Sequence, residues 1–161
     1  MSIPTKIYYN WQQVEVDTFD LYQQIQKSGE TIDLVVGVTR GGLVPGVILS
    51  HLLNVPFIPI TVQLRDGLTI DVDASDIDAV TFSSLNENIL IVDDICDSGA
   101  TFDLLKKNIE KSGDIECVKF ASLWYNEGCL FNVHYTARHK NSKLENSWIV
   151  FPWESLFNGA R

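Results

Sequence analysis

The sequence of 161 residues is poor in cysteine and in positive charge, and it lacks long apolar runs. Its three cysteines, Cys96, Cys117 and Cys129, show no C-x-x-C spacing and leave one over, which indicates neither a disulfide framework nor a zinc site. We expect Cys96 to be a small packing residue. No apolar run approaches the roughly 18 residues of a membrane span, and residues 1–10 lack the apolar core of a signal peptide. These absences predict a cytoplasmic protein with no membrane partner.

Positive charge is scarce, with 12 basic against 21 acidic residues and a net charge of -9. Such an acidic surface argues against nucleic acid as a partner. Any polyanion that binds must be held locally, by backbone amides, a few well-placed cations or a metal ion.

The length and the hydrophobic content of 45% predict one domain, 1–161, with a substantial core. Asn10 is a plausible helix cap and Gly29 a helix stop, while Asp66-Gly67 is typical of a hairpin turn. The pattern predicts helices over 11–27, 43–54 and 100–112, and strands over 33–38, 55–63, 88–92, 115–124, 133–137 and 147–151. Alternating strands and helices predict an α/β fold with a central, mostly parallel sheet flanked by helices.

The segment 68–84 is acidic and is interpreted as a weak strand followed by a solvated loop or short helix. Calcium binding is the alternative for such a run of aspartates. The spacing of an EF-hand loop is not present, so the segment is better explained as surface.

The first strand end with unusual chemistry is Thr39-Arg40-Gly41-Gly42, which follows the apolar run at 33–38. In an open parallel sheet, ligands bind beyond the carboxyl ends of the strands. Paired glycines let the backbone approach a ligand closely, and arginine offers a planar fork of donors to phosphate oxygens. An ordinary strand-to-helix turn is the alternative for this segment.

The second strand end with unusual chemistry lies in ILIVDDICDSGAT, Ile89 to Thr101. Its residues 97–101 enter a helix whose free N–H groups and dipole favour an anion, although Asp97 alone is also a plausible helix cap. The adjacent Asp93 and Asp94 are costly at a strand end unless they bind a sugar diol or magnesium. A receiver domain or a Walker B strand also ends in aspartates, but the chain has no G-x-x-x-x-G-K-[ST] loop.

ILIVDDICDSGAT resembles the PRPP-binding signature of type I phosphoribosyltransferases. TRGGLVPG, Thr39 to Gly46, is similar to the pyrophosphate loop of that family, and SWIVFPWES, Ser147 to Ser155, resembles the base-binding hood of its xanthine-guanine and hypoxanthine branch. The resemblance implies a core over about 30–125 and a small hood from about 1–12 and 126–161. It also implies a homodimer or homotetramer.

The activity implied by this resemblance is transfer of the 5-phosphoribosyl group of PRPP to a purine base, a 6-oxopurine such as guanine, xanthine or hypoxanthine, with Mg²⁺ as cofactor. Asp97 would be the catalytic residue that takes or relays the proton of the imidazole ring. The implied binding residues are Asp93, Asp94, Asp97, Ser98, Gly99, Ala100 and Thr101 for the ribose and 5′-phosphate, Asp93, Asp94 and Glu154 for the metal, Thr39, Arg40 and Gly41 for pyrophosphate, and Trp148, Ile149 and Asn126 for the base. The pyrophosphate loop often carries a non-proline cis peptide in this family, and a mobile loop is implied near 63–69.

One position departs from the pattern implied by the resemblance. Oxopurine members usually carry a lysine where this chain has Asn126, and no lysine occurs between Lys119 and Lys140. Asparagine donates and accepts hydrogen bonds but supplies no charge. Phosphoribosyl transfer to a different base therefore stays an alternative, as does a non-catalytic regulator that binds PRPP or a nucleotide.

Overall fold

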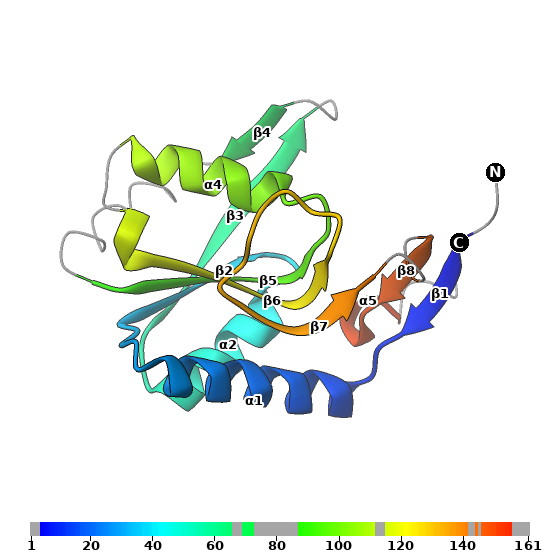
Figure 1. The fold of residues 1–161 in the computed structure, drawn as a ribbon, viewed down its shortest axis with the longest axis horizontal. Helices are drawn as coiled ribbons and strands as arrows, with labels where there is room; N and C mark the ends of the chain where they lie inside the picture. Colours follow the sequence, from blue (N-terminus) through cyan, green and yellow to red (C-terminus); the bar gives the residue numbers. More distant parts are fainter. Residues whose placement is uncertain are drawn as a thin grey trace.

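The computed structural model describes residues 4–65, 69–72, 87–111, 115–141, 144 and 146–155. Within these ranges the strands form one large sheet, in the order β4-β3-β2-β5-β6-β7, and a separate pair, β1 with β8. All neighbours in the large sheet run parallel except β3 and β4. The predicted α/β fold with a mostly parallel central sheet is confirmed (Figure 1). The strands are β1 (Thr5–Tyr8), β2 (Leu34–Thr39), β3 (Phe57–Arg65), β4 (Thr69–Val72), β5 (Ile89–Cys96), β6 (Val118–Asn126), β7 (Tyr135–Lys140) and β8 (Ser147–Val150).

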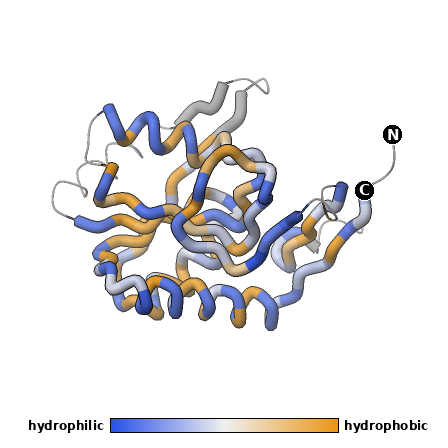
Figure 2. Tube along the Cα trace, viewed as in Figure 1, coloured by the Kyte–Doolittle hydropathy of each residue, from blue (hydrophilic) through white to orange (hydrophobic). Residues whose placement is uncertain are grey.

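Helices cover both faces of the large sheet (Figure 1). The helices α1 (Trp11–Ser28) and α2 (Leu43–Leu53) pack on one face and α4 (Ala100–Glu110) on the other, and α5 (Pro152–Ser155) is a short turn near the carboxyl end of the described chain. Within β5, Leu90 and Val92 face α1 and α2, whereas Ile89 and Ile91 face α4. Because both faces are covered, the first part of β5, ILIV, is apolar without alternation, and orange stretches mark apolar residues within the sheet in Figure 2. No described helix is long and apolar enough to cross a membrane.

The bounds of α1 follow from its capping residues. The side chain of Asn10 accepts a hydrogen bond from the N–H of Gln13 at 2.8 Å, and the side chain of Gln13 accepts one from the N–H of Asn10 at 2.9 Å. This reciprocal pair is a capping box. Gly29 ends the helix in the left-handed conformation, with φ 73°, which glycine adopts at little cost. Both predicted ends of this helix are therefore confirmed.

Several other predicted bounds are shifted. Residues Ile115–Cys117 form a 3-10 turn, so the strand predicted from 115 begins at Val118. The strand predicted for 133–137 runs from Tyr135 to Lys140, and the one predicted for 88–92 continues to Cys96. The carboxyl ends of β5 and β7 lie beyond the predicted ends because the backbone of both strands pairs with β6 through polar positions. An apolar pattern does not detect such pairing. The predicted Asp66-Gly67 turn and residues 73–84 of the acidic segment lie outside the described residues.

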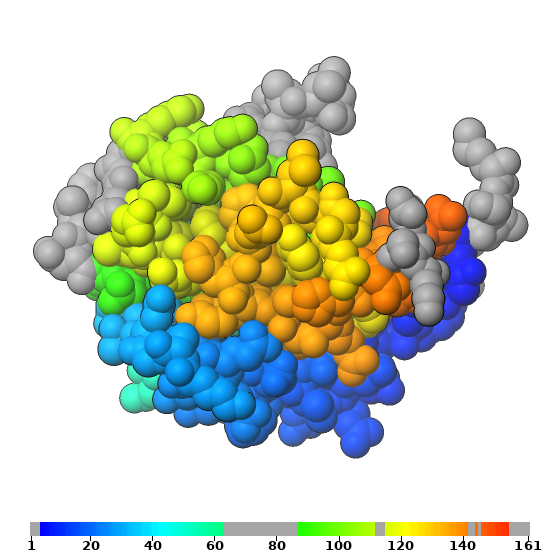
Figure 3. All heavy atoms as spheres, viewed as in Figure 1, coloured from blue at the N-terminus to red at the C-terminus, as the bar shows by residue number. Residues whose placement is uncertain are grey.

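The two ends of the described chain meet in the β1–β8 pair, beside the large sheet (Figures 1 and 3). The ring of Tyr9, just after β1, packs edge-on against the rings of Trp124 and Phe151. The ring centroids are 6.0 Å and 5.5 Å apart, respectively. These contacts attach the pair to the large sheet. The range proposed for the hood, 126–161, also contains β7, which pairs with β6 and extends the large sheet.

The adjacent tyrosines Tyr8 and Tyr9 have different surroundings in the structure. Tyr9 is buried, and its hydroxyl donates to Asp17, which also accepts from the guanidinium of Arg138 on β7. Tyr8 is 64% exposed. Tyr9 therefore belongs to a buried polar network that joins α1, β7 and the segment after β1.

Candidate active site

The candidate site lies where the chain leaves β2 and β5 in opposite directions. From β2 the chain passes through α2 to β3, and from β5 it passes through α4 to β6, on the other side. The pairing between β2 and β5 ends at Gly37 and Val92, although β5 continues to Cys96. An α/β sheet binds its ligands in the crevice at such a switch point. Both of the polar segments singled out in the sequence lie at this crevice.

The glycines that follow β2 bring the backbone against β5. The peptide bond between Thr39 and Arg40 is cis, as the family resemblance implied. A Cβ atom at Gly41 would overlap the carboxylate of Asp94, and one at Gly42 would overlap the carbonyl oxygen of Val92. A side chain at either position would displace these groups, and the loop 39–42 therefore lies against Asp94 and the backbone of β5.

Asp93 and Asp94 are partly buried carboxylates on the last part of β5. The carboxylate of Asp93 accepts a hydrogen bond from the N–H of Asp94 at 2.9 Å. Burial, and then repulsion from Asp94, raises the pKa of Asp93 well above its ordinary value. Burial, and then repulsion from Glu154 of α5, raises the pKa of Asp94 to about 7. This concentration of negative charge suits a cation or a polyhydroxyl ligand.

The segment 97–101 surrounds a pocket of about 100 Å³. Gly99, with φ 81°, is the cap of α4, and a Cβ there would also collide with Cys129 and Phe131. The first N–H groups of α4 lack partners within the helix, as at any helix start, and such groups favour an anion. In the structure, the N–H of Ala100 donates to the hydroxyl of Ser98 at 3.3 Å. The pocket is lined by Asp93, Ile95, Cys96, Asp97, Ser98, Gly99, Ala100, Thr101 and Phe102. The geometry is suited to a phosphate group.

Asp97 is held by donors from two neighbouring strands. Its carboxylate oxygen Oδ1 accepts from the amide Nδ2 of Asn126 at 3.1 Å and from the ammonium Nζ of Lys140 at 3.3 Å. The side chain of Asp97 is 58% exposed, so the carboxylate also faces solvent. Lys140 was not among the predicted site residues, because the strand was predicted to end at 137. The parallel register of β6 and β7 is the signal that identifies it.

The hood residues are placed by β8 and α5. Trp148 is 57% exposed, whereas Ile149 is buried. The carboxylate of Glu154 accepts from the N–H of Phe151 at 3.1 Å, which caps its own short helix. Among the described residues, no hydrogen bond joins Trp148 or Arg40 to the aspartates of the site.

The residues Asp93, Asp94 and Glu154 were predicted to hold a metal ion. In the part of the chain that the structure describes, no three Asp, Glu, His or Cys side chains gather as a complete ligand set. Magnesium is usually bound by one or two carboxylates together with water and substrate oxygens. The partly buried pair Asp93-Asp94 fits that donor pattern, because burial and repulsion from neighbouring carboxylates raise the pKa values of both residues, and a bound cation would relieve this repulsion.

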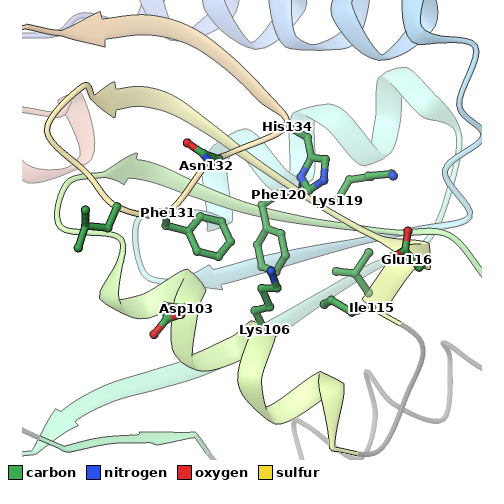
Figure 4. Close-up of a pocket in the computed structure, with 11 residues that line it drawn as sticks. Asp103, Lys106, Ile115, Glu116, Lys119, Phe120, Phe131, Asn132 and His134 are labelled. Atoms are coloured by element: carbon green, nitrogen blue, oxygen red, sulfur yellow. Dashed lines mark hydrogen bonds between the residues drawn. The ribbon is translucent and has the colours of Figure 1, made fainter.

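A larger hollow of about 370 Å³ lies between α4, the start of β6 and the segment before β7 (Figure 4). The hollow is lined by Phe120 and Phe131, and by His134, which lies near Lys119 (Figure 4). The ammonium of Lys119 pairs with Glu30 at 3.2 Å. The hollow lies beside the amino end of β6, and none of the predicted site residues lines it. We therefore place the site at the carboxyl edge of the sheet.

Two of the cysteines lie beside the candidate phosphate pocket. The Sγ atoms of Cys96 and Cys129 are 3.5 Å apart, and both thiols are free. Burial, and then the Cys129 thiol, raises the pKa of Cys96, which disfavours the reactive thiolate. The prediction that Cys96 is a packing residue agrees with its burial.

Comparison with known proteins identifies the class. The family described as phosphoribosyl transferase domain matches residues 4–155, and the chain therefore belongs to this family of phosphoribosyltransferases. It is similar to xanthine-guanine phosphoribosyltransferase from Idiomarina loihiensis, with 26% identity over 92% of this chain and 87% of that protein.

Solved structures agree with this family. The purine phosphoribosyltransferase from Pyrococcus horikoshii superposes with a TM-score of 0.77 and 29% identity, over 93% of this chain and 95% of that chain. The xanthine-guanine-hypoxanthine phosphoribosyltransferase from Helicobacter pylori has a TM-score of 0.72 at 20% identity, over 96% of this chain and 97% of that chain, and shows the same fold.

Proposed function

We propose that this phosphoribosyltransferase transfers the 5-phosphoribosyl group of PRPP to a ring nitrogen of a 6-oxopurine, such as guanine, xanthine or hypoxanthine. The products are the nucleoside monophosphate and pyrophosphate. The observation that carries the proposal is the meeting of the loop 39–42, the pair Asp93-Asp94 and the loop 97–101 at one switch point. The purine names of the similar proteins support the choice of base.

Each part of the crevice has a role in the proposed reaction. The bond between the sugar carbon and pyrophosphate breaks, and a bond from that carbon to the base nitrogen forms. Thr39, Arg40 and Gly41 would bind the departing pyrophosphate, and residues 97–101 the 5′-phosphate. Asp97 would take or relay the proton that the imidazole ring loses. Because the sugar becomes oxocarbenium-like, catalysis would rest on positioning and charge stabilisation.

Magnesium is the proposed cofactor. Asp93 and Asp94 would hold the ion together with ribose and pyrophosphate oxygens, with Glu154 contributing negative charge nearby. When bound, the ion stabilises the negative charge on the leaving pyrophosphate.

The base would be held between the hood and the end of β6. The exposed ring of Trp148 is available for stacking, and Ile149 would offer backbone groups to the edge of the base. The carbonyl Oδ1 of Asn126 accepts from the N–H of Gly128 at 3.1 Å, which turns its amide NH₂ toward Asp97. This orientation makes Asn126 a donor at the site.

The test is pyrophosphate release with PRPP and Mg²⁺, measured separately with guanine, xanthine, hypoxanthine, adenine, orotate and uracil. We expect turnover with at least one 6-oxopurine and much less with the other three bases. Turnover with adenine, orotate or uracil alone would replace the 6-oxopurine assignment by a different base. Tight binding of PRPP or a nucleotide without turnover would instead favour a non-catalytic regulator.

We also propose a homodimer or homotetramer in the cytoplasm, without nucleic acid or membrane as partner. Large apolar side chains are exposed at the end of β1 and on α1, and an interface between copies would cover such residues. They include Tyr8, Trp11, Val16 and Phe19. Light scattering after size-exclusion chromatography would give the mass of the assembly, and a monomer at micromolar concentration would contradict this proposal.

A further inference from the structure

The ends of β6 and β7 place two different donors side by side. The last pair in their parallel register is Asn126 with Lys140. Both side chains bind the same atom, Oδ1 of Asp97, at 3.1 Å and 3.3 Å respectively. Two donors on one oxygen fix the rotation of the carboxylate, and neither hydrogen bond uses Oδ2.

The ammonium of Lys140 is unusual in its burial. Its side chain is only 8% exposed, whereas lysine is rarely buried unless it is paired. A lysine at the end of an edge strand has a long stem that can reach water, so Lys140 is not forced to be buried. Its burial beside Asp97 therefore points to a function for the pair. Asp97, the partner of Lys140, lines the same pocket as the partly buried Asp93, in a protein with a net charge of -9.

We propose that Lys140 is a positioning and specificity-determining residue, which supplies from β7 the positive charge that Asn126 does not supply from β6. This inference rests on the proposed function. Lys140 holds Asp97 in place and selects purines that carry an oxygen rather than an amino group at the six position.

The chemistry of the purine edge connects the two roles. In guanine, N7 and O6 are adjacent acceptors on one edge, whereas adenine has the acceptor N7 beside a donor NH₂ group. If Asp97 takes or relays the proton of the imidazole ring, its carboxylate lies at the edge of the base that carries N7. A donor that contacts Asp97, such as Lys140, then lies next to the substituent at the six position. An ammonium has three N–H donors and no acceptor. It therefore stabilises O6 and opposes an amino group.

The central variant is Lys140→Met, which keeps the length of the side chain and removes the charge. We expect kcat/KM for hypoxanthine to fall by roughly 10- to 100-fold, the scale of a hydrogen bond to a charged group. The ratio of hypoxanthine to adenine turnover should fall with it, while the KM for PRPP should stay nearly unchanged. Lys140→Arg should retain part of the selectivity.

An exchange of the two side chains separates this role from general stability. Lys140→Asn alone should lose selectivity, and the double variant Asn126→Lys with Lys140→Asn should regain it, because the ammonium returns to the adjacent strand end. The matched control is Lys119→Met, which removes a partly buried β6 lysine paired with Glu30 at the opposite edge. This control should keep the selectivity.

Two outcomes would overturn the inference. One is an unchanged hypoxanthine-to-adenine ratio in Lys140→Met, and the other is an exchanged double variant no better than Lys140→Asn. Binding of GMP and AMP, measured by calorimetry on the same proteins, gives a second readout if Lys140→Met folds poorly, because Lys140→Arg and the double variant remain. A wild-type protein that binds GMP in preference to AMP but turns over no base contradicts the proposed function and leaves the Lys140 test intact. A wild type that binds neither nucleotide overturns both.

Discussion

Charged side chains lie both at the amino ends of the strands of the large sheet, the amino edge, and at their carboxyl ends, the carboxyl edge, but in different surroundings. At the amino edge, Lys119 pairs with Glu30 at 3.2 Å, and the carboxylate of Asp33 accepts from the N–H of Asn88 at 2.8 Å. These groups are partly exposed and matched, so they are typical of a solvated surface. At the carboxyl edge, Asp93 and Asp94 lie next to each other, partly buried, and their pKa values are raised. The charges at the amino edge are paired, whereas those of Asp93 and Asp94 at the carboxyl edge repel each other and lower the stability. This difference distinguishes the candidate site from the rest of the surface.

The largest expected effect is at Asp97. The substitution Asp97→Asn should lower turnover by roughly 10²-fold or more, the scale of a general acid–base group, while PRPP binding is kept. Steady-state kinetics and PRPP titration measure the two quantities. The matched control is Asp33→Asn at the amino edge, which should leave turnover unchanged. Full activity in Asp97→Asn with the best base would exclude a proton-relay role.

A second prediction compares two glycines. Gly41→Ala places a Cβ into the carboxylate of Asp94, so kcat/KM for PRPP should fall by roughly 10-fold or more, the effect of about 1.4 kcal/mol of lost transition-state binding. Gly29→Ala, where φ is 73° and nothing lies within 4 Å, should lower the free energy of unfolding by about 1 kcal/mol and leave catalysis unchanged. Kinetics and urea denaturation distinguish these effects. Equal loss of stability without a change in PRPP kinetics at Gly41 would show that this loop does not bind substrate.

The third prediction concerns pH. The pKa of Asp94 is raised to about 7 in the folded protein, above its value in the unfolded chain. Between these two pKa values the folded protein keeps a proton that the unfolded chain has released. The free energy of unfolding of the ligand-free protein should therefore fall as pH rises toward 7, and this contribution is lost above it. Cation binding requires the ionised form, so Mg²⁺–PRPP should bind more tightly at pH 8 than at pH 6 and release protons.

Two measurements check this dependence. The melting temperature of the ligand-free protein should decrease between pH 5 and pH 8, and Asp94→Asn should make that decrease smaller. Calorimetry in buffers of different ionisation enthalpy should detect the protons released on binding. A wild-type melting temperature that increases over the same range, or a slope unchanged in Asp94→Asn, would contradict the assignment.

The smallest effect is expected at the amino edge. Glu30→Gln removes the pair with Lys119, whose partners are both partly exposed, so the free energy of unfolding should fall by at most about 1 kcal/mol. Urea denaturation measures the change, and turnover should be the same as in the wild type. A loss of activity in this variant would mean that the two edges are coupled.

Much of the candidate site could be singled out in the sequence because its residues are contiguous. The motif from Ile89 to Thr101 combines an apolar strand, two adjacent aspartates and a helix start, and each part has a local physical reason. The glycines at 41 and 42 were predicted to let the backbone approach closely, and the structure shows what they approach. Lys140 was missed because its role depends on the register between β6 and β7, which no local pattern contains.

The sequence by itself determined the α/β architecture, the two polar strand ends and the phosphoribosyltransferase family, because apolar periodicity, capping residues and contiguous motifs are local properties of the chain. Only the tertiary structure decided which strands are neighbours and how far they pair. It extended β5 through Asp93 and Asp94, set Gly41 against Asp94, and brought Asn126 and Lys140 to the same oxygen of Asp97. These contacts join residues that are distant in sequence, and they follow from strand order and register.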